Sequence, residues 1–544
     1  MMTRSGHVDS FTRDNLPPPE QWPQLLLDRP EFRYPERLNC AVAFVDDQVA
    51  AGRGDRPCIL APGVSWTYAG LKDHVDRIAR ALAETHGLLP GNRVLLRSPN
   101  TPLMVATTLA VIRAGGVVVA TMPLMRAREL VAVIEKAQIR LAVCDHGLME
   151  ALETARQAAP VLERIVPMGA ATSDSLEVQA AAASPGCPAC DTAADDVCLI
   201  GFTSGTTGVP KGTLHFHRDL LAICDGYAAH MVRATEDDRF IGSPPLAFTF
   251  GLGGLVLFPL RAGASTVLLE KAGPHELVDA IEQFRASICF TAPTAYRVMA
   301  GLAPGRDLAS LRLCVSAGEA LPRPTFEAWK AVTGLPIVEG IGATEMLHIF
   351  IGSTPETVRP GATGLPVPGY EAKIIDTQGQ PVPDGTPGRL AVRGPTGCRY
   401  LADARQGVYV QDGWNITGDT YVRDADGYFW YQARSDDMIV SAGYNIAGPE
   451  VEAALLTHPA VRECGVVGQP DPERGQIVKA FIVLAEGQAP DDTLAKALQE
   501  HVKAEISPYK YPRAIAFVDA LPRTDTGKLR RTELRAIAAG ETPG

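Results

Sequence analysis

The sequence has little that would direct it to a membrane or to nucleic acid. Residues 1–20 contain no apolar core, so no signal peptide is visible and we expect a cytoplasmic protein. The net charge is −11 and the pI is about 5.6, which argues against a nucleic-acid binder that relies on a basic face. The eleven cysteines have no regular spacing, as is usual in a reducing cytosol.

Two segments could be mistaken for other features. Residues 103–122 form an apolar run, but Arg113 lies at its middle and Gly115-Gly116 follow, so we predict a buried helix that leads into a buried strand over 117–120 rather than a membrane span. Cys187 and Cys190 have the spacing of half a zinc site. No second pair follows, and the surrounding Ala/Pro/Ser/Gly-rich stretch favours a loop.

Several catalytic signatures are missing. There is no Gly-x-Ser-x-Gly elbow of a hydrolase. The best candidate for the dinucleotide motif Gly-x-Gly-x-x-Gly, residues 340–345, lacks the third glycine. The spacing of a standard P-loop is also not met.

What the sequence does contain is a dense polar loop after an apolar run over 197–202. Residues 203–212 read Thr-Ser-Gly-Thr-Thr-Gly-Val-Pro-Lys-Gly, with three glycines, four hydroxyl residues and Lys211. Glycines expose backbone N–H groups, and successive N–H groups form a concave anion site. The loop therefore predicts that the protein binds a polyphosphate.

The organisation of the 544 residues indicates an α/β protein. Short apolar runs alternate with helical patterns as far as about residue 430, which predicts layered, mostly parallel sheets. Glycines and prolines between residues 373 and 393 favour a small barrel-like subdomain. After the polar residues near 436, we predict a compact α+β C-terminal domain with helices over 450–456 and 492–506 and strands over 464–467 and 479–484.

These motifs together resemble the adenylate-forming superfamily of acyl- and aryl-CoA ligases, adenylation domains and beetle luciferases. Besides the 203–212 loop, the matching segments are Gly340–Glu345, Thr417-Gly418-Asp419, Arg434–Asp437 and Pro522–Lys528, and they follow the order of the family from about residue 66 to 528. The resemblance implies a large N-terminal domain over 1–433, a hinge over 434–436 and a mobile C-terminal domain over 437–544.

The resemblance also implies roles for individual residues. Lys528 would bridge the acyl carboxylate and the α-phosphate of ATP, Thr344 would bind the α-phosphate, and Glu345 would hold Mg²⁺. Asp419 would accept from the ribose hydroxyls, with Arg434 beside it. The other implied nucleotide-binding residues are Thr203, Ser204, Gly205, Thr206, Thr207, Gly208, Lys211, Gly318, Glu319, Ala320, Glu339, Gly340, Ile341 and Gly342.

One position departs from most of the superfamily. Ile341 stands where a tyrosine usually stacks on the adenine, and an aliphatic side chain can still cover the ring. The run from Gly340 to Phe350 is similar to that of benzoate and aminobenzoate CoA ligases in particular.

The resemblance further implies two arrangements of one site. Lys528 serves the first half-reaction and then leaves so that pantetheine can enter, with Asp436 at the hinge and Gly443 and Tyr444 bordering the thiol tunnel. No motif identifies the groups that bind the nucleotide of CoA, and Arg462, Arg474 and Lys510 are candidates.

Two segments, residues 246–253 and residues 346–350, are expected to form the acyl pocket. The pocket residues we expect in them are Phe248, Thr249, Phe250, Gly251, His348 and Ile349. The first segment lacks the aspartate that pairs with the ammonium of an α-amino acid in amino-acid adenylation domains, so such a substrate is disfavoured. Flat apolar walls suit an aromatic ring. The Thr249 hydroxyl or the His348 imidazole could partner an ortho substituent, which favours 2-aminobenzoate, then benzoate, then medium-chain fatty acids.

The expected reactants are ATP, Mg²⁺, an aryl carboxylate and CoA. An acyl carrier protein as the final acceptor stays open, since both thiols end in pantetheine, and so does a homodimer. A luciferase-like oxygenase would share every nucleotide motif, so the sequence does not separate it from a ligase. A non-catalytic relative would have lost Lys528 or Glu345, and both are present.

Overall fold

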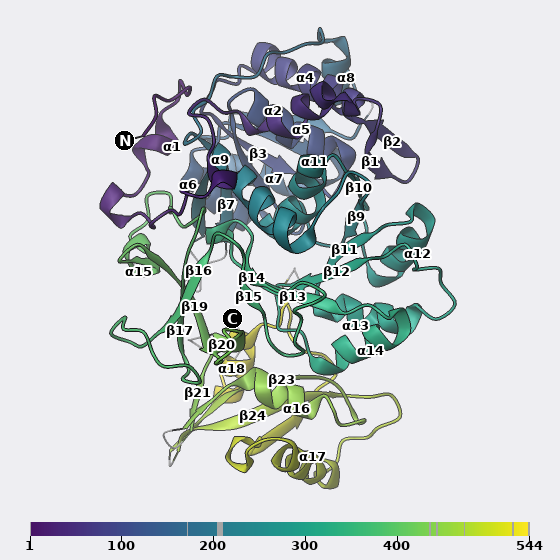
Figure 1. Cartoon of the computed structure of the whole chain (residues 1–544), viewed down its shortest axis with the longest axis vertical. Coiled ribbons are helices and arrows are strands. Elements are labelled where there is room, and N and C mark those ends of the chain that lie inside the picture. The colour runs from purple at the N-terminus through teal and green to yellow at the C-terminus, as the bar shows by residue number, and fades with distance from the viewer. Residues whose placement is uncertain are drawn as a thin grey trace.

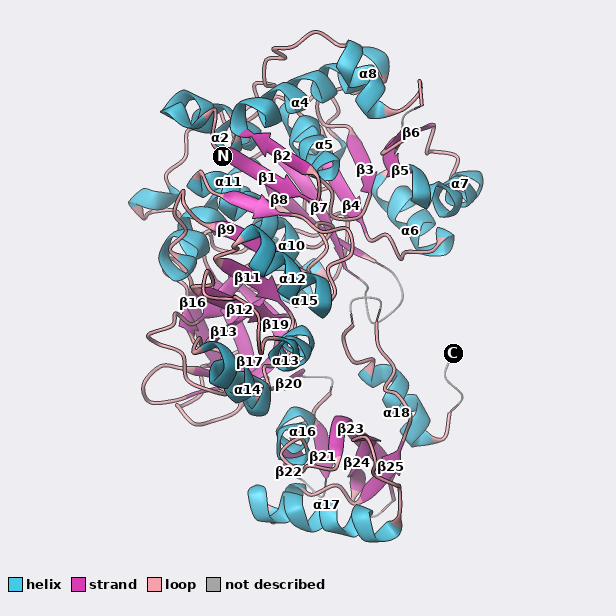
Figure 2. Cartoon of the chain, turned by 90° about the vertical axis from the view of Figure 1, so that its right-hand side faces the viewer, coloured by secondary structure: helices cyan, strands magenta, loops and turns pink. Residues whose placement is uncertain are grey.

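The computed structural model of the chain describes residues 2–170, 172–203, 210–434, 437–441, 444–472, 474–524 and 527–541. It has a large N-terminal part and a smaller C-terminal domain, which lies at the bottom of Figures 1 and 2 next to α14 (Arg323–Thr333). Layered sheets with helices on them make up the N-terminal part, so the predicted α/β class is confirmed.

The first sheet holds the strand that leads into the polar loop. Its strand order is β6-β5-β3-β4-β7-β8, parallel except for the β7–β8 pair. The bounds are β3 Arg93–Arg97, β4 Val117–Thr121, β5 Leu141–Asp145, β6 Arg164–Met168, β7 Val197–Thr203 and β8 Lys211–Phe216. The apolar run at 103–122 is indeed a buried helix, α5 (Pro102–Arg113), followed by β4. Thr101 caps this helix by accepting from the N–H of Met104 at 3.1 Å.

The second sheet is larger, and two of its strands, β12 and β13, lead into or contain residues that the sequence assigned to the nucleotide. Its order is β15-β14-β13-β12-β11-β9-β10-β1-β2, with a parallel centre from β1 to β13. The bounds are β1 Pro57–Ala61, β2 Val64–Thr67, β9 Arg239–Gly242, β10 Ser265–Val267, β11 Ile288–Thr291, β12 Leu313–Ala317, β13 Ile337–Gly342, β14 Ile349–Gly352 and β15 Leu365–Pro366.

Several of the helices that cover the two sheets bury one apolar stripe, whereas α5 is buried at every position from Met104 to Arg113. In α6, for example, Leu130, Val133, Ile134 and Ala137 are buried at helical spacing. The longer helices of this part are α4 Tyr68–Arg80, α6 Ala127–Ala137, α7 Met149–Ala158, α8 Leu176–Ala182, α9 His217–Ile223, α12 Pro274–Phe284 and α13 Pro293–Leu302, besides α5 and α14. Among the described residues, no helix has the length and apolarity that a membrane crossing requires.

A small antiparallel sheet follows at the place of the predicted subdomain. Its order is β16-β17-β19-β18, and β20 also pairs with β19. The bounds are β16 Glu371–Ile375, β17 Gly388–Arg393, β18 Val410–Gln411, β19 Trp414–Arg423 and β20 Phe429–Arg434. The strand pairing recorded for the described residues leaves this sheet open between β16 and β18.

The C-terminal domain is α+β, with helices and strands at the predicted places. Its sheet runs β22-β21-β24-β23, with β25 parallel to β24. The bounds are β21 Ile439–Ser441, β22 Tyr444–Ile446, β23 Val461–Asp471, β24 Gly475–Leu484, β25 Ala514–Phe517, α16 Gly448–Leu455, α17 Asp492–Glu505 and α18 Arg531–Ala539.

One buried ion pair ties the segment after β17 to α9, the helix that follows β8. Arg399 donates to Asp219 at 2.9 Å, and both side chains are fully buried. The backbone on each side of Tyr400 is hydrogen-bonded to β8, because Leu214 N–H donates to Arg399 O at 2.7 Å and Leu401 N–H donates to Gly212 O at 2.8 Å. The pair and these bonds fix Tyr400 beside the start of β8.

Breaking this pair from one side should cost stability. We expect Arg399→Met to destabilise the protein by about 3–5 kcal/mol, because Asp219 would be left as a buried, uncompensated charge. The Asp219 carboxylate also accepts from Phe216 N–H at 3.0 Å, at the start of α9. The double variant with Asp219→Asn should recover part of the loss, since the amide oxygen can still accept that bond. Thermal unfolding measures both.

The partly exposed pair Arg393–Glu371, whose side chains are 24% and 51% exposed, provides the matched control. Arg393→Met should cost no more than about 1 kcal/mol. Equal losses in Arg399→Met and Arg393→Met would show that Arg399 does not anchor this segment.

Candidate functional site

The first group of site residues gathers where β8 begins. Lys211 Nζ lies 3.4 Å from Glu345 Oε1 and 3.0 Å from the Tyr400 hydroxyl, which donates to the same carboxylate oxygen at 2.6 Å. Glu345 and Tyr400 are buried, and Lys211 Nζ also lies 5.0 Å from the Tyr400 ring centre. The structure thus brings together the lysine and the glutamate that the sequence assigned to phosphate and Mg²⁺.

This group has the chemistry of a magnesium–phosphate site. Glu345 uses one oxygen for Tyr400 and Lys211, and its second oxygen has no hydrogen-bond partner in the part of the chain that the structure describes. Mg²⁺ binds proteins through one or two carboxylates and takes its remaining ligands from phosphate and water. Glu345 fits this requirement as the single carboxylate.

The phosphate loop itself lies mostly outside the described residues. Ser204, Gly205, Thr206, Thr207 and Gly208 are not described, so their predicted role stays a prediction. Thr203 and Lys211, on either side, are paired in the β7–β8 ladder. The Thr203 hydroxyl is buried and has no hydrogen-bond partner among the described atoms. Such a donor is costly when unpaired and suits a ligand oxygen.

The ribose pair is built across two strands. Asp419 on β19 and Arg434 on β20 are directly opposite each other, and their side chains are 3.2 Å apart. Burial raises the pKa of the Asp419 carboxyl, and the Arg434 guanidinium opposes that rise. Asp419 is thus a buried acceptor with a cation at its side. Its role toward the ribose hydroxyls stays a prediction.

The predicted adenine wall consists of two adjacent strand ends. The register of β12 and β13 places Ala317 beside Gly340, so Gly318, Glu319 and Ala320 follow one strand while Glu339, Ile341 and Gly342 belong to the other. The Glu339 carboxylate accepts from Leu321 N–H at 3.2 Å and joins the two segments. Burial raises the pKa of Glu339 to about 8.

Lys528 reaches this wall from the C-terminal domain. Its Cε and Nζ lie 3.5 and 3.8 Å from the position that a Cβ would take at Gly318. The side chain keeps contact with solvent, but desolvation still lowers the pKa of its amine, while the charges of Glu319 and Asp419 raise it. The structure therefore places Lys528 beside Glu319 and in the field of the ribose pair.

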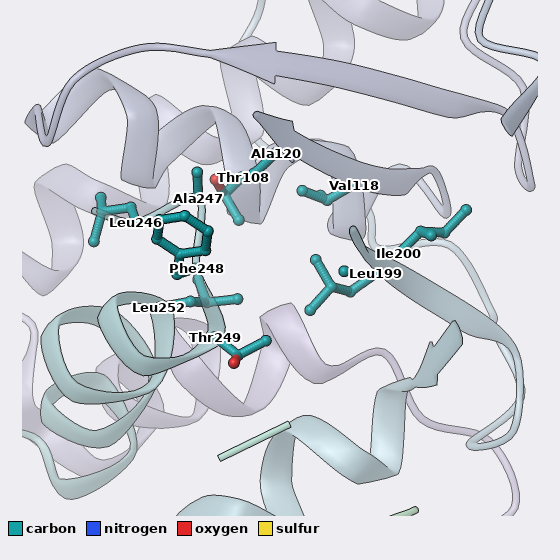
Figure 3. Close-up of a pocket in the computed structure, with 11 residues that line it drawn as sticks. Thr108, Val118, Ala120, Leu199, Ile200, Leu246, Ala247, Phe248, Thr249 and Leu252 are labelled. Atoms are coloured by element: carbon teal, nitrogen blue, oxygen red, sulfur yellow. The ribbon is translucent and has the colours of Figure 1, made fainter. Parts of the chain in front are cut away.

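The acyl residues do not all line one pocket. Figure 3 shows a narrow pocket formed by Phe248 and Thr249 together with side chains of α5, β4 and β7. Its lining residues are Thr108, Val118, Ala120, Leu199, Ile200, Gly201, Leu246, Ala247, Phe248, Thr249 and Leu252. A Cβ at Gly201 would come within 2.6 Å of Thr344 Cγ2 and 3.8 Å of Thr249 Cγ2. The pocket therefore lies next to Thr344, the predicted α-phosphate ligand.

Phe250, His348 and Ile349 lie outside the lining of that pocket. His348 is buried in an aromatic cluster with Tyr227, Phe250 and Phe258, whose ring centres are 4.6–5.7 Å from the imidazole. Neither of its nitrogens has a hydrogen-bond partner in the described structure, and burial lowers its pKa to about 3. His348 is hence a neutral group at pH 7.

Ile349 and Gly251 have packing roles. Ile349 is buried on β14 and its side chain occupies the space that a Cβ at Gly340 would need. A Cβ at Gly251 would come within 2.2 Å of Pro245 O, so the backbone approaches closely there. Neither observation places these residues against a substrate.

The predicted thiol path is described only in part. Asp436 and Gly443 are outside the described residues, and only the backbone of Tyr444 is described, on β22. Lys510 is paired with Glu450 at 2.6 Å, and Arg474 N–H donates to Asp471 at 2.8 Å. Arg462 is exposed, and its carbonyl accepts from Arg297 at 3.1 Å.

Sequence reasoning missed Tyr400 and Tyr409. The Tyr409 ring packs edge-on against Tyr400 at 5.7 Å, and its hydroxyl is buried without a partner among the described atoms. Both residues lie between β17 and β18 of the small sheet, far from Glu345 along the chain. No spacing rule connects them, since only the pairing of residues 399–401 with β8 brings Tyr400 into the site.

Comparisons with known proteins agree with this geometry. Residues 46–400 match the family of AMP-binding enzymes, and residues 450–528 match the AMP-binding enzyme C-terminal domain. A benzoate–CoA ligase of Thauera aromatica is 36% identical over 513 residues, covering 93% of this chain and 97% of that protein. A 4-hydroxybenzoate–CoA/benzoate–CoA ligase of Rhodopseudomonas palustris is 35% identical, covering 92% and 94%.

Solved structures are similar over the same length. The crystal structure of an anthranilate CoA ligase in complex with anthranoyl-AMP has a TM-score of 0.89 at 34% identity and covers 94% of this chain and 99% of that one. A benzoate CoA ligase from Burkholderia xenovorans has a TM-score of 0.83 at 33% identity and covers 91% and 99%. The chain thus belongs to the AMP-binding enzyme family and is an AMP-forming CoA ligase.

Proposed function

We propose that the protein is an aryl-CoA ligase that activates 2-aminobenzoate with ATP and transfers the acyl group to CoA, releasing AMP and pyrophosphate. The observation that carries the proposal is that Thr249 contributes a hydroxyl-bearing side chain to a mostly apolar pocket beside Thr344. The other threonine of the lining, Thr108, already donates its hydroxyl proton to the Met104 carbonyl at 2.8 Å. The relatives named for benzoate and anthranilate support an aryl acid in general. Benzoate is the second candidate, because an unsubstituted ring needs no polar partner in a mostly apolar lining.

The lining of the pocket favours a neutral ortho substituent. An aryl amine is uncharged near pH 7, so a hydroxyl is a sufficient partner for it. None of the residues that line the pocket is a carboxylate. The ammonium of an α-amino acid would therefore be buried without a counter-charge, which is costly.

The first half-reaction joins the acid to ATP. A carboxylate oxygen attacks the α-phosphorus, the bond to the β-phosphate bridging oxygen breaks, and pyrophosphate leaves with that electron pair. Lys528 would neutralise charge between the carboxylate and the α-phosphate, while Lys211 and Thr203 would hold the outgoing phosphates. Bound Mg²⁺ would supply a further positive charge on phosphate oxygens, held by Glu345. Fixed charges and donors of this kind are usually the largest single catalytic contribution.

The second half-reaction transfers the acyl group. The CoA sulfur attacks the acyl carbonyl carbon, the thiol proton is lost, and AMP departs from the tetrahedral intermediate. The site around Gly318 is occupied by Lys528 in this structure, so the C-terminal domain must move before pantetheine takes its place. CoA is the proposed acceptor, and a pantetheinyl carrier protein would enter by the same chemistry.

The substrate assignment predicts a change of selectivity in Thr249→Val, which keeps the shape of the side chain and removes the hydroxyl. The ratio of kcat/KM for 2-aminobenzoate to that for benzoate should fall about three- to tenfold, the value of one neutral hydrogen bond. Val118→Ala, which changes the same pocket without a polar group, should leave that ratio within about twofold. An unchanged ratio in Thr249→Val would remove Thr249 from substrate recognition.

The role of Lys528 predicts a split between the half-reactions. Lys528→Ala should lower pyrophosphate release by a factor of about 10² or more, whereas thioester formation from supplied acyl adenylate should stay near the unmodified rate. Rapid-quench measurement of each step separates them. Lys496→Ala, on the exposed face of α17, is the matched control. Equal losses in both steps would contradict the assignment.

A further inference from the structure

A chain of charged groups connects the N-terminal part to the loop that carries Lys528. Arg297, on α13, donates from one guanidinium nitrogen to Glu463 at 3.2 Å and from the other to the carbonyl of Arg462 at 3.1 Å. Glu463 and Arg462 belong to β23 of the C-terminal domain. These contacts therefore cross between the two parts of the molecule.

The same carboxylate holds the lysine loop from the other side. Arg523 donates to the second oxygen of Glu463 at 2.7 Å and to the carbonyl of Gly527 at 2.7 Å. Gly527 immediately precedes Lys528, and Thr524 N–H donates to the Lys528 carbonyl at 2.7 Å. Glu463 thereby connects the backbone next to Lys528 to a helix of the N-terminal part.

We propose that Arg297, Glu463 and Arg523 form an interdomain latch that positions Lys528 for adenylation and must open for thioester formation. The Arg297–Glu463 ion pair crosses the interface, whereas the Arg523–Glu463 ion pair stays within the C-terminal domain. Rotation of that domain therefore breaks the first ion pair and leaves the second intact. The two half-reactions are those of the proposed function, on which this inference rests.

The exposure of the three side chains makes the latch weak enough to be reversible. Arg297, Glu463 and Arg523 are 36%, 22% and 31% exposed, so each ion pair is partly screened by water. Pairs of this kind shift an equilibrium by a small factor. A fully buried pair would hold the adenylation arrangement too firmly for the second half-reaction.

The test compares the two half-reactions in variants of Arg297, whose ion pair with Glu463 crosses the interface. Arg297→Gln should lower the single-turnover rate of adenylate formation about two- to fivefold, and thioester formation from supplied adenylate should be unchanged or faster. Arg297→Lys keeps the charge and should recover part of the adenylation rate. Arg306→Gln is the control, because Arg306 pairs with Asp279 and Glu282 of its own domain.

A second measurement needs no substrate. Glu463→Gln weakens the ion pairs of Glu463 with both Arg297 and Arg523. Hydrogen exchange of the peptide over 522–530 should therefore be about threefold faster or more than in the unmodified protein. In Arg306→Gln the exchange rate of this peptide should be unchanged. Equal effects of Arg297→Gln on both half-reactions, or unaltered exchange in Glu463→Gln, would overturn the latch. If the protein activated no aryl acid while Glu463→Gln still accelerated exchange, the latch would stand and the proposed function would fall.

Discussion

The site depends on holding positive charge in place before a triphosphate and a carboxylate arrive. In the structure each of these cations lies close to an acidic side chain. Lys211 is paired with Glu345, Arg434 is paired with Asp419, and Lys528 lies near Glu319. The three cations come from different units, namely the start of β8, the small antiparallel sheet and the C-terminal domain. Charges held this way need little reorganisation when the substrate binds, which is the condition for strong electrostatic catalysis.

Tyr400 shows how the fold serves that arrangement. Its hydroxyl bridges Lys211 and Glu345, and its backbone is attached to β8 on both sides. The buried ion pair between Arg399 and Asp219 holds the same segment against α9. Tyr400, from the segment after β17, thereby contacts two residues that are predicted to bind phosphate and Mg²⁺.

Sequence patterns predicted the parts that depend on local periodicity. The apolar run at 103–122 became helix α5 and strand β4, and the predicted helix over 492–506 is α17 (Asp492–Glu505). The family resemblance also assigned Lys211 to phosphate and Glu345 to Mg²⁺, and the structure places these two side chains 3.4 Å apart. Tyr400, Gly201 and the latch of Arg297, Glu463 and Arg523 could not be predicted, because each depends on contacts between segments far apart in the chain. His348 shows that side-chain surroundings are also hard to predict from sequence. We expected its imidazole to be a polar group of the acyl pocket, and in the structure it is buried among aromatic rings.

The most direct test of the account is pyrophosphate release with ATP and Mg²⁺ over a panel of acids, with and without CoA. The panel contains 2-aminobenzoate, its 3- and 4-isomers, benzoate, 2-hydroxybenzoate, octanoate and phenylalanine. The account predicts the highest kcat/KM for 2-aminobenzoate, with continued turnover only when CoA is present. A preference for octanoate or phenylalanine would contradict the aryl pocket, and equal turnover without CoA would contradict the ligase.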